Sequence, residues 1–157
     1  MNGALISACG QYRYRLWRKW GSDAAMCFIM LNPSTADAQQ DDPTIRKCIG
    51  FAKRNGYDGI EVVNLFAWRA TNPADLKSLG YPVGPDNDKN IMEAVDKSEL
   101  VVLAWGAHAR KLQRPTYVRE LLRFSKIPAY ALALLADGTP AHPLMLPYTC
   151  KPIEVKP

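Results

Sequence analysis

The stretch AAMCFIMLNPST, residues 24–35, decides the fold class of this chain of 157 residues. Its first eight residues form an apolar run that ends at Asn32-Pro33, as expected of a strand buried on both faces. Two further strand-like runs follow, GIEVVNLF at residues 59–66 and LVVLAW at residues 100–105. Strands buried on both faces are typical of parallel sheets covered by helices, so the stretch predicts an α/β fold.

The segments around these strands complete an alternating order. Amphipathic patterns predict helices at residues 43–55, 86–97 and 107–125. YRYRLWRK predicts an edge strand with one wet, basic face at residues 12–19, and AYALALLA predicts a last strand at residues 129–136. The resulting order is that of a three-layer α/β/α domain with a mainly parallel central sheet.

Two prolines bear on where these helices begin. Pro43 can open the first helix, with Asp41 or Asp42 as its cap. Pro115 lies inside the last predicted helix, where it could break it.

Composition indicates one globular domain over residues 1–157, because 48% of the residues are hydrophobic, 22% are charged and no linker divides them. The net charge of +5 favours a polyanionic partner without requiring one. No targeting segment and no apolar run of membrane-spanning length is visible, so we expect a soluble cytoplasmic protein, a monomer without membrane contact. The four cysteines form no CxxC pair, which argues against a zinc knuckle or a disulfide framework.

Polar side chains follow the predicted strands, at the sheet edge where α/β proteins bind ligands. They are Asn32, Pro33 and Ser34 after residues 24–31, Asn64 near the end of 59–66, Gly106 and His108 after 100–105, and His142 after 129–136. Two carboxamides and two imidazoles at one edge could bind a planar heterocycle, orient a water molecule or stabilise an anion. The sequence therefore predicts a site there.

Each of these residues also has a structural interpretation. Asn32 before Pro33 is equally compatible with a turn, and Asn64 could be a core amide bonded to backbone. His108 could be an ordinary residue in a first helical turn, and His142 could lie in an extended loop. Their joint occurrence at strand ends is what favours a site.

Several function classes lack their motifs. The chain has no GxGxxG or GxxxxGK[ST] loop, no GxSxG, no HExxH and no carboxylate pair at glycosidase spacing. Asp37, Asp41 and Asp42 could hold Mg²⁺, but helix capping and solvated loop charge explain them better. We therefore expect no metal and no cofactor.

Basic residues are densest in the predicted helix 107–125. Arg110, Lys111 and Arg114 begin that helix beside the predicted site and could contact a phosphate backbone, although a solvated helix face explains them equally well. Trp68, in the loop after Asn64, is the tryptophan best placed to stack on a base.

The same segments carry two family resemblances. MLNPSTAD, DDPTIRKC, VVNLFAWRAT, PVGPDND, VVLAWG and HPL resemble the domain of unknown function 1643 family over nearly the whole chain. More distantly, the sequence resembles the uracil-DNA glycosylase superfamily in four ordered motifs: Leu31-Asn32-Pro33, Val62-Val63-Asn64-Leu65, Trp105-Gly106-Ala107-His108-Ala109 and His142-Pro143-Leu144.

The second resemblance implies a DNA glycosylase-like hydrolase that excises a flipped modified or damaged base from single- or double-stranded DNA. It implies that Asn32 positions the hydrolytic water, that Asn64 pairs with the base edge and that His142 stabilises the leaving base. Met30 stands where the superfamily has a small glycine, and HPLMLPY replaces its His-Pro-Ser-Pro. These departures favour the alternative, a catalytically inactive module that binds a nucleotide or nucleic acid in the same crevice. A small-molecule enzyme acting on a free nucleoside is a further alternative.

Overall fold

The computed structural model of the chain describes residues 1–22 and 24–157. Its strands are β1 (Asn2–Ile6), β2 (Arg13–Lys19), β3 (Ala25–Met30), β4 (Gly59–Asn64), β5 (Leu100–Leu103), β6 (Ala129–Ala131) and β7 (Ile153–Val155). Its α-helices are α1 (Pro43–Arg54), α2 (Pro73–Ser78), α3 (Asn87–Asp96) and α4 (Arg114–Phe124). Two short 3₁₀ helices, η1 (Ala107–Ala109) and η2 (Pro143–Met145), complete the elements of the described chain. The predicted α/β class is confirmed.

The seven strands form one mixed sheet in the order β1-β2-β4-β3-β5-β6-β7. Only the pairings β4-β3, β3-β5 and β5-β6 are parallel, whereas β1-β2, β2-β4 and β6-β7 are antiparallel. The prediction of a mainly parallel sheet is therefore wrong. For β1 and β2 the physical reason is connectivity, because the short turn between them can join only antiparallel strands.

The segment YRYRLWRK is not an edge strand, since β2 lies between β1 and β4. Its basic side chains Arg13, Arg15 and Arg18 are also buried rather than wet. β1 pairs with the outer edge of β2. Its sequence, NGALI, is short and contains a glycine, so it gave no strand prediction.

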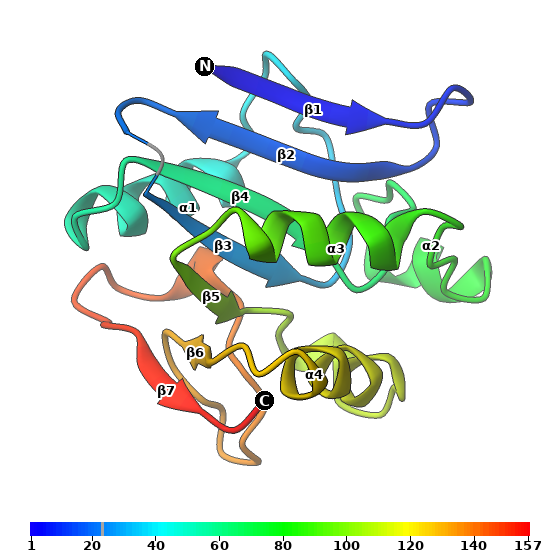
Figure 1. The fold of residues 1–157 in the computed structure, drawn as a ribbon. Coiled ribbons are helices and arrows are strands. Elements are labelled where there is room, and N and C mark those ends of the chain that lie inside the picture. Colours follow the sequence, from blue (N-terminus) through cyan, green and yellow to red (C-terminus); the bar gives the residue numbers. More distant parts are fainter. Residues whose placement is uncertain (23) are drawn as a thin grey trace.

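Helices pack on both faces of the sheet (Figure 1). One core cluster joins the face of Ile29, Val63 and Leu103 to α3 and α4, and the other joins the face of Phe28 and Val62 to α1. In Figure 1, α3 and α4 lie in front of the sheet and α1 lies behind it.

Helix α1 begins at Pro43, as predicted, because the side chain of Asp42 accepts a hydrogen bond from the backbone N–H of Ile45 at 2.9 Å. Helix α4 begins at Arg114 and not at residue 107, and Pro115 lies in its first turn, where the missing N–H costs nothing. Strand β6 ends at Ala131, five residues before the predicted end. Helix α2 lies between the predicted strand at residues 59–66 and the predicted helix at residues 86–97, where no helix was predicted, and it is capped by Asn72.

The central strands determine where a site can lie. Because β3, β4 and β5 are parallel neighbours, their carboxyl ends meet at one edge of the sheet, and Met30 at the end of β3 pairs with Asn64 at the end of β4. In the described part of the chain, none of the helices combines the length and the apolar character that crossing a membrane would require.

Candidate functional site

A cavity of about 670 Å³ opens at the carboxyl ends of β3, β4 and β5. A volume of this size suits a small organic ligand or one nucleotide. Seven of the predicted site residues line it: Asn32, Pro33, Ser34, Asn64, Gly106, His108 and His142. The structure thus brings together residues that are far apart in the sequence.

Asn64 is the most unusual polar group in the cavity wall. Its side chain is 1% exposed, and neither its Oδ1 nor its Nδ2 has a hydrogen-bond partner among the described residues. A buried amide without partners costs roughly 1–3 kcal/mol. A ligand that offers both a donor and an acceptor would remove this cost.

The backbone at Asn64 is held from the opposite face of the sheet. Nδ2 of Asn87 in α3 donates to the carbonyl oxygens of Asn64 at 2.9 Å and Leu65 at 3.1 Å. Nε of Arg114 in α4 donates to the same Leu65 oxygen at 2.8 Å. These bonds fix the end of β4, so the Asn64 side chain is presented from a rigid element.

Asn32 is held by its own amide group. Its Nδ2 donates to the carbonyl oxygens of Pro33 at 3.0 Å and Ala70 at 2.7 Å. Because both amide hydrogens are used, Oδ1 has a defined orientation as an acceptor. In the described chain no donor reaches that oxygen, so it is available to a ligand or a water molecule.

His142 follows Ala141 and caps η2. Its Nδ1 accepts a hydrogen bond from the backbone N–H of Leu144 at 3.2 Å. Burial lowers the pKa of His142 from its ordinary value of 6.5, and His108 lowers it further, while Asp42 opposes the shift. The neutral ring with Nδ1 as acceptor carries its proton on Nε2, which makes Nε2–H a donor for a ligand in the cavity.

Gly106 allows His142 to lie this close to β5. Its φ of +82° belongs to glycine, and a Cβ added there would lie 3.0 Å from the Cβ of His142. Its N–H also donates to the carbonyl oxygen of Pro140 at 3.0 Å. His108 follows on η1 and is exposed at the cavity.

Trp68 does not line the cavity. Its ring packs edge-on against Tyr12, with the centroids 5.3 Å apart. The backbone bridge between these residues holds Trp68 beside β2, away from the strand ends that form the cavity. The described structure therefore gives it no position from which to stack on a ligand there.

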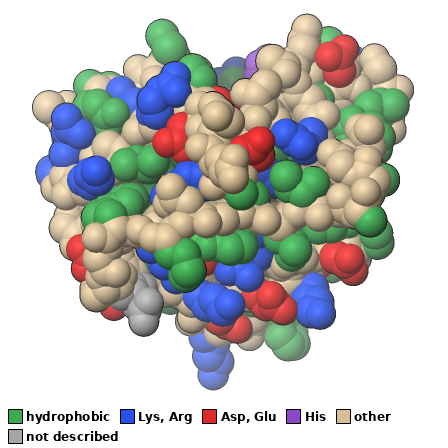
Figure 2. Space-filling model, turned by 90° about the horizontal axis from the view of Figure 1, so that it is seen from above, with side chains coloured by type: hydrophobic (Ala, Val, Ile, Leu, Met, Phe, Trp, Pro, Cys, Tyr) green, Lys and Arg blue, Asp and Glu red, His purple; other side chains and the backbone are tan. Residues whose placement is uncertain are grey.

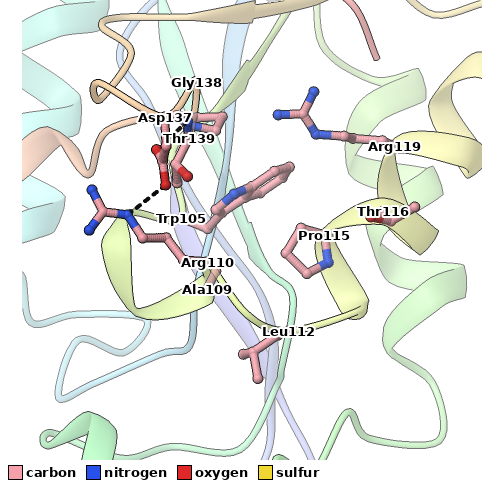
Figure 3. A pocket seen from close by; sticks show the side chains of 11 residues that line it. Trp105, Ala109, Arg110, Leu112, Pro115, Thr116, Arg119, Asp137, Gly138 and Thr139 are labelled. Carbon is pink, nitrogen blue, oxygen red and sulfur yellow. Dashed lines mark hydrogen bonds and ion pairs between the residues drawn. The ribbon is translucent and has the colours of Figure 1, made fainter.

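The three basic residues predicted to contact nucleic acid lie outside the cavity. Nε of Arg110 forms an ion pair with Asp137 at 2.9 Å in a neighbouring pocket of about 180 Å³, beside Trp105 and Arg119 (Figure 3). Arg114 pairs with Asp88 besides bonding Leu65, so its charge is compensated and partly buried. Lys111 is exposed. Figure 2 shows one face of the molecule, on which Lys and Arg alternate with acidic and apolar groups instead of forming one basic patch.

The acidic residues considered for Mg²⁺ have structural partners. Asp42 caps α1, Asp41 pairs with Arg18 at 2.8 Å, and Asp37 accepts the backbone N–H groups of Gln39 and Gln40, which lower its pKa. Within residues 1–22 and 24–157, no group of three or more His, Cys, Asp or Glu residues is arranged to hold a metal ion. Burial raises the pKa of the Cys27 and Cys48 thiols, which makes both poor nucleophiles.

Among the cavity residues that the sequence analysis did not select are Arg13, Asp42 and Met145. Arg13 on β2 was assigned to a wet face, Asp42 was considered as a cap, and Met145 was not considered for a role. Met145 is 88% exposed beside Leu144 at the cavity rim. The run HPLMLPY was the available signal for Met145, whereas nothing in the local pattern placed Arg13 in the cavity.

The fold and the cavity define an α/β protein with a ligand-sized site at the carboxyl edge of its central strands. A family model described as protein of unknown function, DUF1643, matches residues 13–144, and the chain belongs to this family. No curated protein and no solved structure matches it.

Proposed function

We propose that the protein is a DNA-binding protein with a three-layer, uracil-DNA glycosylase-like fold that hydrolyses the N-glycosidic bond of a flipped modified or damaged base. One observation carries this proposal. Asn64 is buried at the cavity wall with both amide atoms unpartnered. A carboxamide pairs with the adjacent donor and acceptor of a base edge, which is how enzymes that flip bases read them.

The other groups of the cavity suit the proposed chemistry. Oδ1 of Asn32 would accept a hydrogen bond from a water molecule and orient it toward the anomeric carbon of the sugar. Water adds to that carbon as the bond to the base breaks, and the base leaves with the bonding electrons. The added water then loses a proton to the solvent, and the anionic base takes up a proton from the solvent, which completes the hydrolysis. Nε2–H of neutral His142 would stabilise the negative charge that develops on the base.

The cavity rim offers a means of holding the duplex open. Leu144 and Met145 are exposed and follow His142-Pro143 in the chain. Apolar side chains that insert between base steps are common in proteins that distort DNA. This position suits a wedge that fills the space of an extruded base.

A catalytically inactive nucleotide- or nucleic-acid-binding module is the alternative. Two observations favour it. An amide such as Asn32 is a poor general base. Met30, which is buried, also lines the cavity at the end of β3, where its side chain restricts how closely a base can approach the backbone.

The test is an excision assay on oligonucleotides that carry uracil, hypoxanthine, oxidised pyrimidines or hypermodified pyrimidines, scored for abasic sites. We expect activity that is lost in Asn32→Ala and His142→Ala while DNA affinity is retained. Asn55→Ala is the matched control, because Asn55 also donates Nδ2 to a backbone carbonyl, that of Phe51 at 2.8 Å, but lies outside the cavity. Excision by Asn32→Ala at the parent rate would refute its role. Absence of excision across the panel, with DNA binding that Asn64→Leu abolishes, would establish the binding module.

A further inference from the structure

Arg13 is a buried cation in the wall of the same cavity. It is 2% exposed, and it lines the cavity together with Asn64 and His142. Arginine is seldom buried without an anionic partner, because the loss of hydration is costly. The burial of Arg13 beside the cavity therefore needs a physical explanation.

An irregularity in strand pairing directs Arg13 to the cavity. Leu5 of β1 pairs with Arg15, but Ile6 pairs with Arg13, so Tyr14 is an extra residue in β2. Regular alternation would place Arg13 on the face of Arg15, which contacts Glu61 on β4. The extra residue turns Arg13 to the opposite face, where Leu16 packs. Bulges that redirect a side chain in this way are frequent beside active sites.

The guanidinium of Arg13 uses only part of its hydrogen-bonding capacity. Nη1 donates to the carbonyl oxygen of Ala36 at 3.0 Å. Nε is buried without a partner, and Nη2 has no hydrogen bond within the described chain. Nε–H and Nη2–H point to the same side of the planar group and form a fork for two oxygen atoms.

The charge of Arg13 is compensated only in part. None of the ion pairs among residues 1–22 and 24–157 includes it, whereas Arg15 pairs with Glu61 and Arg18 pairs with Asp41. Asp42, whose charge acts on Arg13, forms its hydrogen bonds with the backbone N–H groups of Ile45 and Ala36. Burial is the main cause that lowers the pKa of Arg13 to about 10; the charge of Asp42 opposes this shift, and the nearby cations Arg69 and Arg18 add to it.

We infer that Arg13 forms an oxyanion subsite, and that the ligand of this cavity carries a phosphate or a carboxylate which the Nε/Nη2 fork binds while Asn64 contacts the planar part of the same ligand. The two groups lie in one cavity of about 670 Å³, large enough for a nucleotide or a carboxylated base. This inference rests on the proposed function only in taking the cavity as the ligand site, and it does not require bond cleavage.

Calorimetric titration of the full chain with two matched pairs of probes tests the subsite. The first pair is uridine 5′-monophosphate and uridine, and the second is 5-carboxyuracil and uracil. We expect the anionic member of at least one pair to bind at least about tenfold more tightly than its neutral partner, because charge-assisted bidentate bonds contribute at least this factor. The pair that shows the preference identifies the source of the oxyanion. Equal affinity within both pairs, or no binding of either anionic probe, would overturn the subsite without use of any variant.

Variants assign the preference to the fork. Arg13→Gln should remove it, and Arg13→Lys, which keeps the charge but not the fork, should retain only part of it. Arg46→Gln is the matched control, since Arg46 carries the same charge on the exposed side of α1. This variant should bind the anionic probe with an affinity within about twofold of the parent. An unchanged preference in Arg13→Gln would refute the assignment. If the anionic probe binds preferentially but no base is excised, the anion subsite is supported and the hydrolase activity is refuted. If a base is excised but neither anionic probe is preferred, the hydrolase activity is supported and the anion subsite is refuted.

Discussion

At the scale of single residues, the unpartnered amide of Asn64 lowers the stability of the fold but is free to bind a ligand. We expect Asn64→Leu to raise the free energy of unfolding by about 1–2 kcal/mol, because it replaces an unpartnered buried amide with an apolar side chain of similar size. The same change should abolish ligand binding. Urea denaturation and probe titration measure the two effects.

Asn87 provides the matched control for Asn64. It is equally buried and its Oδ1 is also without a partner in the described chain, but its Nδ2 donates to the carbonyl oxygens of Asn64 and Leu65. Asn87→Leu should therefore lower the free energy of unfolding by about 1–3 kcal/mol. A destabilising Asn64→Leu would mean that the amide has a partner in solution.

His142 should make the protein sensitive to acid. Its folded-state pKa lies below the ordinary 6.5, so between these two values the unfolded chain binds more protons than the folded one. Stability should be unaffected by this group above pH 6.5 and should fall as the pH decreases through the window below it. Protonation would also remove the Nδ1 acceptor of the Leu144 N–H.

Chemical denaturation at about pH 7.5 and about pH 5, on either side of the ordinary histidine pKa, measures this effect. His142→Asn keeps a capping acceptor without a titrating ring and should show a smaller loss of stability in acid. His108→Asn should keep most of the loss, because burial of the His142 imidazole, the main cause of its lowered pKa, is unchanged. An identical loss in His142→Asn would assign the acid sensitivity to other groups.

At the scale of elements, the turn after β5 sets the position of His142. Gly106→Ala should lower the free energy of unfolding by about 1–3 kcal/mol, since it imposes a side chain on a backbone conformation reserved for glycine. It should also weaken ligand binding, because the added Cβ meets the Cβ of His142 at 3.0 Å. Denaturation and titration measure the two effects separately.

Gly138→Ala separates strain from displacement. Gly138 also has a positive φ, of +86°, but no described atom lies within 4 Å of its added Cβ. This variant should be destabilised by backbone strain alone and should bind ligand like the parent. If both variants bind like the parent, the contact between Gly106 and His142 does not position the imidazole.

At the scale of the whole molecule, the chain carries a net charge of +5, and the basic residues Arg110, Lys111 and Arg114 differ in their capacity to bind DNA. Arg110→Ala with Lys111→Ala should make the dependence of log Kd on log salt shallower by about one for each phosphate that the double variant no longer neutralises. Arg114→Ala should mainly destabilise the fold, because Arg114 bonds Leu65 and pairs with Asp88. Filter binding over a salt series, with denaturation of each variant, distinguishes these effects. An unchanged slope in the double variant would exclude this surface from DNA binding.

The sequence by itself determined the central strands, α1 and the polar residues at the strand ends. Apolar runs identify β3, β4 and β5, and Asp42-Pro43 identifies the start of α1, because burial and capping leave local patterns. These local patterns were also sufficient to select seven residues that line one cavity.

Only the tertiary structure decided the order of the strands in the sheet and whether each polar group of the cavity has a hydrogen-bond partner. Antiparallel pairing of β2 with β4 and of β6 with β7 depends on contacts between distant segments, which no local period records. The unpartnered amide of Asn64 and the free fork of Arg13 are likewise properties of what surrounds them. One extra residue at Tyr14 reversed the face of Arg13, because side chains in a strand alternate with a period of two and a single insertion exchanges the two faces.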